Sequence, residues 1–186
     1  FPEAKTAEEY AVPDSVTTIS NEAFFYCKGI TSVTIPDGVA TIGEQAFMYC
    51  ESLTSISIPD SVTSIGEDAF SGCESLTSIK IPNGVTSIED STFYGCRGLT
   101  SVTIPDSVTS IGAYTFGFCE SLTSITIPDS VTSIGKSAFW SCDGFISVTI
   151  PDSVTSIGDG AFNHCESLTS INVDSNNKYY SSEDSV

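Results

Sequence analysis

Apolar positions along the chain recur with a period of 23 residues, and each unit repeats the same arrangement of apolar and polar side chains. The unit that begins at Cys50 reads CESLTSISIPDSVTSIGEDAFSG, and the next unit begins at Cys73. A single unit has no second layer against which to bury its apolar side chains, whereas stacked copies cover one another. The repetition therefore predicts a solenoid in which each apolar position forms a column through the core.

Each unit also carries the signals for its own secondary structure. Residues 53–58 (LTSISI) alternate as a strand with one face inward, and Pro59 ends this strand by removing a backbone donor. Residues 62–65 (VTSI) indicate a second, shorter strand, and residues 67–73 (EDAFSGC) predict about two turns of helix with acidic residues at the N-terminal end. We expect a right-handed, curved repeat solenoid with one continuous parallel β-sheet on its concave side. Short second strands and short helices are expected on its convex side.

Two columns mark the core of this solenoid. The phenylalanine column contains Phe24, Phe47, Phe70, Phe93, Phe116, Phe139 and Phe162. The cysteine column contains Cys27, Cys50, Cys73, Cys96, Cys119, Cys142 and Cys165. Stacked cysteines would have parallel Cβ vectors, which is poor geometry for a disulfide, and no CxxC pair suggests a metal site. We therefore expect seven buried, reduced and unreactive thiols, and neither a metal nor a cofactor.

The regular repeats occupy residues 11–172, which hold seven units of 23 residues. Thr6 and Glu9 have the spacing of a capping box, which predicts a short helix in an N-terminal cap or appended segment at residues 1–10. Residues 173–186 begin like another strand and then diverge from the repeat. We expect this C-terminal segment to be a truncated unit of a longer protein.

The consensus SLTSIxIPDSVTSIGxxAFxxC resembles the BspA-like leucine-rich repeat family, which contains surface and secreted proteins of bacteria and some protozoa. The resemblance covers residues 11–173 and recurs in all seven units. It implies a leucine-rich repeat horseshoe that lies outside the cell or on its surface and adheres to an extracellular protein or a cell-surface ligand. The localisation rests on the resemblance alone, because the sequence shows no signal-peptide pattern.

Charge narrows the classes of partner. The chain has 24 Asp and Glu against 6 Lys and Arg, which gives a formal net charge of −18. Nucleic acid binding requires a cluster of basic residues, and none is present here. An acidic membrane surface would repel the chain, and no apolar stretch approaches the about 18 residues of a membrane helix. A protein partner or a glycan remains, and the sequence does not indicate an oligomeric state.

Two surfaces are candidates for binding such a partner. Thr and Ser form outward rows on the strands, and the predicted ligand-binding residues on the concave side are Lys80, Thr100, Thr103, Thr123 and Thr126. These hydroxyl residues are also ordinary fillers of the wet side of a strand. A second surface consists of the aromatic residues close before the cysteines, namely Tyr26, Tyr49, Tyr94, Phe118 and Trp140. Packing between neighbouring units is the alternative explanation for these aromatic residues.

Two further columns raise questions about ions and backbone geometry. An acidic turn column, in which Asn83 replaces one Asp, suits the acceptance of turn N–H groups, and calcium binding is the alternative. A glycine column, represented by Gly66, is interrupted by Glu89 in the fourth unit and by Ser20 in the first. If that position required positive φ, Glu89 would be strained. We therefore expect negative φ at Glu89 and glycine chosen for close packing.

No catalytic constellation is present. His164 is the single histidine, and no nucleophile is paired with it. The sequence therefore predicts an extracellular or cell-surface protein-interaction domain without enzymatic activity. The alternatives are a passive spacer that carries an enzyme or an anchor elsewhere in the protein and, more remotely, an ice-binding array of Thr and Ser.

Overall fold

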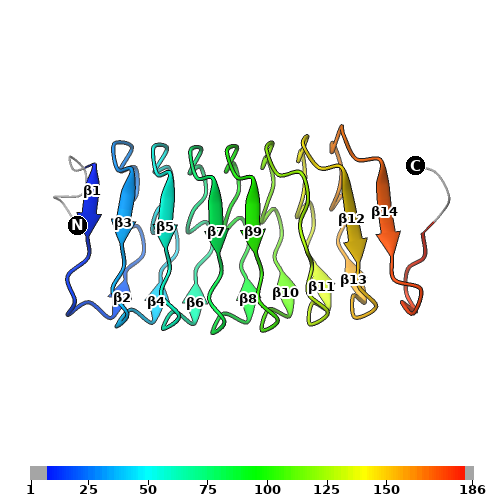
Figure 1. Ribbon diagram of the computed structural model, residues 1–186, viewed down its shortest axis with the longest axis horizontal. Coiled ribbons are helices and arrows are strands. Elements are labelled where there is room, and N and C mark those ends of the chain that lie inside the picture. Colours follow the sequence, from blue (N-terminus) through cyan, green and yellow to red (C-terminus); the bar gives the residue numbers. More distant parts are fainter. Residues whose placement is uncertain (1–7, 183–186) are drawn as a thin grey trace.

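The computed structural model describes residues 8–182, which form a row of stacked coils with fourteen strands (Figure 1). The first strand row contains β1 (Glu9–Ala11), β3 (Ser32–Thr34), β5 (Ser55–Ser57), β7 (Ser78–Lys80), β9 (Ser101–Thr103), β12 (Ser147–Ile150) and β14 (Ser170–Val173). The second strand row contains β2 (Thr18–Ile19), β4 (Thr41–Ile42), β6 (Ser64–Ile65), β8 (Ser87–Ile88), β10 (Ser110–Ile111), β11 (Ser133–Ile134) and β13 (Ser156–Ile157). All pairs are parallel and join equivalent residues of successive units, as in Ser32↔Ser55. The predicted leucine-rich repeat solenoid is therefore confirmed.

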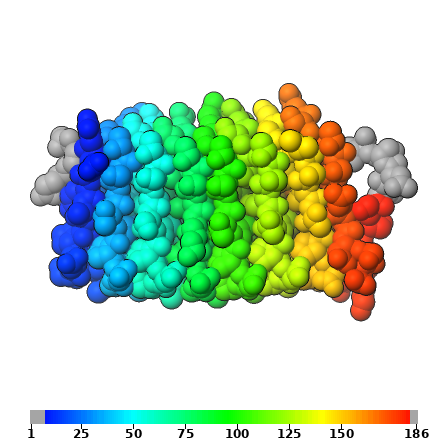
Figure 2. Space-filling view, in the orientation of Figure 1, coloured from blue at the N-terminus to red at the C-terminus, as the bar shows by residue number. Residues whose placement is uncertain are grey.

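The coils pack directly on one another along the solenoid. Figure 2 shows successive coils in contact, with the first and last described coils at opposite ends. Six members of the phenylalanine column lie inside this stack, whereas Phe162 in the last coil is only half-buried. Rings such as Phe70 and Phe93 stack nearly parallel with centroids 5.6 Å apart. Phe93 is fully buried. The repeat period thus places each core residue against its own equivalent.

The third side of each coil is a run of turns, so the predicted short helices are wrong for the described residues. In the second coil, Ala46 N–H donates to the Gly43 carbonyl at 3.3 Å, whereas Phe47 N–H donates to Ala69 of the next coil at 2.7 Å. Gln45 and Tyr49 have φ values of 55° and 59°, which an α-helix does not allow. Each left-handed residue costs on the order of 1 kcal/mol. Hydrogen bonds to the next coil offset this cost, because a helix would have kept its hydrogen bonds to itself.

The expected single continuous sheet is also wrong, because the strand rows form five separate sheets. The first row divides into β1-β3-β5, β7-β9 and β12-β14, and residues 124–126 between β9 and β12 form no strand. The second row divides into β2-β4-β6 and β8-β10-β11-β13. Both rows are therefore interrupted between the third and fourth coils. No residue difference explains the other gap, at residues 124–126.

Glu89 explains why the second strand row is interrupted there. A Cβ atom on Gly66 would lie 2.5 Å from the backbone nitrogen of Glu44, so the glycine column allows the coils to approach. The N–H of Gly66 donates to Ile42 at 2.9 Å, and that of Gly112 donates to Ile88 at 2.8 Å. Within residues 8–182, Glu89 makes no such bond to the coil before it. Its φ is not positive, so the expectation of negative φ and of glycine for close packing is confirmed.

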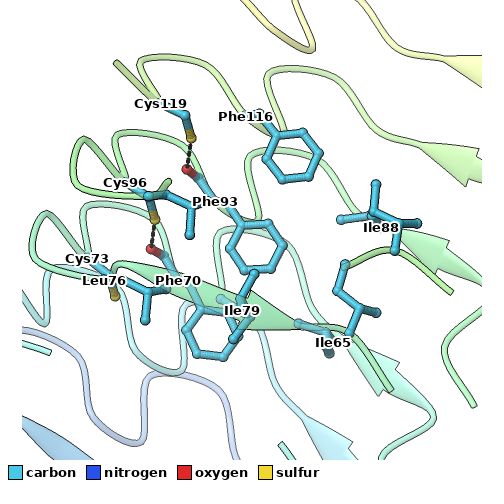
Figure 3. Packing of buried hydrophobic residues seen from close by; sticks show 14 of the residues in the cluster. Ile65, Phe70, Cys73, Leu76, Ile79, Ile88, Phe93, Cys96, Phe116 and Cys119 are labelled. Carbon is cyan, nitrogen blue, oxygen red and sulfur yellow. Dashed lines mark hydrogen bonds between the residues drawn. The ribbon is translucent and has the colours of Figure 1, made fainter. Parts of the chain in front are cut away.

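The cysteine column adds a hydrogen bond that the sequence did not indicate. Each thiol after the first donates to the carbonyl of the phenylalanine in the preceding coil (Figure 3). Cys96 Sγ lies 3.2 Å from the Phe70 oxygen, and Cys119 Sγ lies 3.4 Å from the Phe93 oxygen. The thiol is small and apolar enough for the core, yet it still supplies a donor to a buried carbonyl.

The N-terminal end of the core is covered by a strand. Glu9 belongs to β1, while Thr6, the other residue of the predicted capping box, lies outside the described residues. Tyr10 is the β1 partner of Val33 and packs edge-on against Phe24, with ring centroids 5.6 Å apart. β1 crosses the expected boundary between residues 10 and 11.

The C-terminal segment folds back onto the last coil. β14 continues the repeat to Val173, and residues 174–182 then turn toward the second strand row. Asn177 Nδ2 donates to the Pro151 carbonyl at 2.8 Å, and the Tyr180 hydroxyl accepts the Ile157 N–H at 2.9 Å. These side chains occupy backbone groups that a further coil would otherwise pair.

The phenylalanine stack predicts a large loss of stability when one ring is removed. Phe93→Ala should lower the free energy of unfolding by roughly 3–5 kcal/mol, because the ring is fully buried and its neighbours cannot collapse into the space. Chemical denaturation measures this change. Tyr26→Ala, at an aromatic residue that is 51% exposed, is the control and should change stability little. An unchanged denaturation midpoint for Phe93→Ala would contradict this account of the core.

The interrupted second strand row predicts an effect of restoring the glycine. Glu89→Gly should allow Thr86 N–H and the N–H of residue 89 to bond to the third coil, as their equivalents do elsewhere. Amide hydrogen exchange at these two positions should slow by about tenfold, while the entropic cost of glycine, about 1 kcal/mol, offsets the gain in global stability. Glu67→Gly, at an exposed residue outside the glycine column, should leave both amides unchanged. Equal exchange rates in Glu89→Gly and the parent chain would exclude this cause.

Candidate functional site

The outward side chains of the first strand row form one surface, which we call the strand face. All five residues predicted to bind a ligand, Lys80, Thr100, Thr103, Thr123 and Thr126, are exposed. Lys80 and Thr103 are direct partners in the β7–β9 pair, and Thr126 is the equivalent residue of the next coil. The structure therefore brings Lys80, Thr103 and Thr126 into one row, while Thr100 and Thr123 are exposed three residues before Thr103 and Thr126 in their coils.

The threonines on this face differ in how their hydroxyl groups are used. Thr100 Oγ1 donates to the Thr77 carbonyl at 3.0 Å, and Thr54 Oγ1 donates to Thr31 at 3.1 Å. These hydroxyl protons join one coil to the previous one. Within the described residues, Thr103 and Thr126 make no such bond. Their hydroxyl groups therefore remain available to a ligand.

Two hollows open on the strand face where the strand ladders are interrupted. The larger, about 440 Å³, is lined by Asp37, the residues of β5 up to Asp60, Ser78 and Lys80, at the unpaired junction of β5 and β7. The smaller, about 230 Å³, is lined by Thr126, Asp129 and Asp174 among others, beside the unpaired residues 124–126. Each hollow therefore lies where neighbouring strand segments form no hydrogen-bonded ladder. The consensus sequence of the repeat does not predict these positions.

The hollows are acidic. Asp37 and Asp60 line the larger one, where Lys80 Nζ lies 3.9 Å from Asp60 Oδ1. Both side chains of this ion pair are about two-thirds exposed or more, at 67% and 72%, so the pair contributes little and is easily replaced. In the described part of the chain no three His, Cys, Asp or Glu residues converge as metal ligands. The acidic turn column instead gives this side of the solenoid a negative field.

The aromatic surface lies along the turn side, where the residues contact one another across the coils. Tyr26 and Tyr49 are 51% and 36% exposed, with ring centroids 5.1 Å apart. Tyr94, Phe118 and Trp140 are half-buried, and the Phe118 and Trp140 rings meet at 4.7 Å. Part of the aromatic surface is therefore packing between coils, and part of it faces solvent.

The protonation state of the thiols reflects their burial. Burial raises the pKa of Cys50 and of Cys96 to about 12, so both stay protonated at neutral pH. All seven cysteines are free of disulfides. Cys165, in the last coil, is only half-buried, so the expectation of seven buried thiols is wrong for this residue. His164 beside it is exposed and packs edge-on against Trp140.

Comparisons with known proteins agree with the fold. A family model described as BspA type leucine rich repeat region matches six copies, over residues 1–108 and 86–183. No curated protein sequence matches the chain significantly. None of the described residues forms a helix with the length and hydropathy needed to cross a bilayer.

Several solved structures are similar. A leucine-rich repeat protein from T. pallidum is 28% identical over 89% of this chain and 69% of that one, with a TM-score of 0.60. One from Bacteroides ovatus is 30% identical, covers 87% of this chain and has a TM-score of 0.62. The pneumococcal vaccine antigen PcpA, 22% identical with a TM-score of 0.60, has the same fold. This chain spans 59% of the Bacteroides ovatus protein and 45% of PcpA.

The burial of the thiols predicts selective labelling. A thiol reagent should modify Cys165 in the native protein, because it is the half-buried member of the column, and the other six only after denaturation. Mass spectrometry counts the modified residues. Cys165→Ser should show no labelling before denaturant is added. Native labelling of two or more cysteines would contradict the buried column.

Proposed function

Because the chain belongs to the BspA-type leucine-rich repeat family, we propose that it is an extracellular or cell-surface domain that adheres to a protein partner through its strand face. Proteins of this repeat family are generally scaffolds for interaction rather than catalysts. We extend this property to the present chain, which we assign no enzymatic activity. The adhesive role and the location outside the cell rest on the family.

One observation carries the choice of surface: two acid-lined hollows interrupt an otherwise regular exposed strand face. A regular row of Ser and Thr offers many equivalent contacts and little to distinguish one partner from another. The hollows break this uniformity and provide recesses that a partner's side chains can enter. The aromatic surface also has a hollow, of about 330 Å³, but this hollow lies on the turn side and not at an interrupted strand ladder.

The charge of the hollows indicates the character of the partner. Asp37, Asp60, Asp129 and Asp174 line them, and the whole chain carries a formal charge of −18. Basic side chains of a partner would be attracted over a distance and could replace the weak Lys80–Asp60 contact on docking. We therefore propose a partner protein with a basic binding surface.

An exposed apolar residue adds an anchor to this polar face. Ile146 replaces threonine in its column and is 53% exposed. Its carbonyl accepts the N–H of Thr169 at 2.9 Å, so its backbone is held in the stack while its side chain faces solvent. Burial of one such side chain in an interface contributes roughly 1.5–3 kcal/mol. Ile146 is adjacent in its column to Thr123, one of the predicted ligand-binding residues.

Substitution of the strand face should abolish binding without unfolding the protein. In a plate assay with immobilised extracellular matrix proteins and with cells, we expect the chain to bind, and the variant with Thr100, Thr103, Thr123 and Thr126 changed to Lys to lose binding. The reason is that four added cations repel a basic partner and fill the contact surface. All four residues are exposed, and Thr100 is the one whose hydroxyl bonds the preceding coil among the contacts described above, so circular dichroism should be unchanged and the denaturation midpoint should fall only slightly.

Two controls decide between the surfaces. A matched variant with Thr63, Thr86, Thr109 and Thr132 changed to Lys adds the same charge to exposed positions on the second strand row and should retain binding. Tyr94→Ser combined with Trp140→Ser should also retain it. If only these two control variants lose binding, the binding site does not lie on the strand face. A chain that binds none of the immobilised proteins or cells would favour the spacer.

A further inference from the structure

The residue immediately before each cysteine belongs to one column with a shared backbone conformation. The column contains Tyr26, Tyr49, Gly72, Gly95, Phe118, Ser141 and His164. All seven residues have positive φ, between 54° and 72°. Positive φ is adopted here by tyrosine, phenylalanine, serine and histidine as well as by glycine. The backbone therefore does not require glycine at residues 72 and 95. Two adjacent coils simply lack the side chain that would stand there.

The neighbouring rings do not fill the space above the second glycine. A Cβ atom on Gly72 would lie 2.5 Å from Cδ1 of Tyr49, so the Tyr49 ring covers Gly72. A Cβ atom on Gly95 would meet only the backbone of Gly72, at 3.7 Å, and no side chain within 4 Å. The result is a hollow of about 330 Å³ along the aromatic surface. We call it the aromatic slot, and its walls include the rings of Tyr49, Tyr94 and Phe118.

Polar groups of both kinds surround these rings. Glu51, Glu74 and Arg97 line the slot. Glu51 Oε1 forms an ion pair with Lys28 Nζ at 2.6 Å, and Arg97 Nη1 lies 3.5 Å from Glu120 Oε1. Glu51 and Arg97 therefore each have a partner in a neighbouring coil. Within the described residues, the Glu74 carboxylate and the hydroxyl groups of Tyr49 and Tyr94 have no hydrogen-bonding partner. The slot thus combines ring faces with donors and acceptors at its rim.

We propose that the aromatic slot binds one pyranose ring of a glycan, which lies against the Tyr49 face and bonds through its hydroxyl groups to Glu74 and Arg97. A sugar ring has an apolar C–H face and an edge of hydroxyl groups, which matches a ring wall with a polar rim. The inserted ring would take the place of the side chain missing at Gly95 in the column.

Other occupants fit less well. An aromatic side chain from a protein partner would match the ring walls but would offer fewer hydroxyl groups than a sugar to Glu74 and Arg97 at the rim. A basic side chain could pair with Glu74, but it would also meet Arg97 in the slot and Lys28 beside it, where Lys28 Nζ already lies 4.6 Å from the centre of the Tyr26 ring. The slot lies on the turn side, so this inference does not depend on the proposed role of the strand face.

The proposal is tested by a substitution that places a side chain in the slot. The purified chain is applied to an array of oligosaccharides that end in glucose, galactose, mannose, fucose, N-acetylglucosamine or sialic acid, and titrations with the retained oligosaccharides give the dissociation constants. Gly95→Tyr should weaken binding by at least about tenfold, because it places a ring in the space that the sugar needs. The fold should tolerate this change, since Tyr26 and Tyr49 hold the same position with φ near 60°.

Two further variants distinguish a blocked slot from a general disturbance of the fold. Ser141→Tyr adds the same ring to the same column two coils further on and should leave the dissociation constant unchanged. Glu74→Gln, which keeps the shape of the side chain, should weaken binding by about threefold to tenfold through loss of a charged acceptor. It also tests the slot if Gly95→Tyr fails to fold.

The outcomes are decisive in both directions. Retention of one oligosaccharide class, with loss in Gly95→Tyr and not in Ser141→Tyr, supports the proposal, and the strand-face lysine variant should bind that class normally. Binding of N-acetyl-tyrosinamide without any oligosaccharide would identify a slot for aromatic side chains and overturn the proposal. No retention on the array at millimolar concentration of the chain, or equal binding by Gly95→Tyr, would overturn it as well.

Discussion

The distance between neighbouring coils is the constraint on which the rest of the structure depends. The phenylalanine rings stack with centroids between 4.8 and 5.6 Å apart, near the about 4.8 Å that separates paired strands. At this distance each side chain meets its own equivalent. Cysteine thiols and threonine hydroxyls reach the carbonyl groups of the preceding coil, and glycine is needed where two backbones almost touch. Where a residue does not allow that approach, as at Glu89, the ladder beside it is absent.

The sequence predicted the parts of the fold that follow from burial and from this spacing. Period and polarity report which side chains are inward, so they predict the columns of Phe93 and Cys96. The presence of Glu89 in the glycine column predicts that this column serves close packing. The prediction of a helix on the turn side is wrong because residues 67–73 have a composition that suits a helix but a different backbone conformation. Left-handed φ at residues such as Gln45 leaves no mark in composition when ordinary side chains adopt it.

The candidate sites were harder to predict, for a related reason. The sequence indicated the exposed rows of Thr103 and Thr126, since alternation shows which residues point outward. It did not show the hollow beside Lys80, because that hollow arises from hydrogen bonds that fail to form between two coils. The same holds for the space above Gly95, which depends on where the Tyr49 ring lies. In a repeat protein the regular positions specify the scaffold, while the exceptions to the repeat create distinct surfaces.

The junction of the third and fourth coils has a mechanical consequence. Its strand rows carry no ladder. It is held by the stacked rings, by Thr77, whose N–H and hydroxyl donate to the Thr54 carbonyl at 3.3 and 3.4 Å, and by bonds of the turn side such as Phe70 N–H to Thr92 at 2.9 Å. Hydrogen bonds in this solenoid run along its long axis, and a force applied between the two ends loads the coil interfaces in series. The interface with the fewest bonds yields first. Each 23-residue coil that then unravels lengthens the chain by roughly 80 Å, so the solenoid would lengthen in steps under load rather than fail at once.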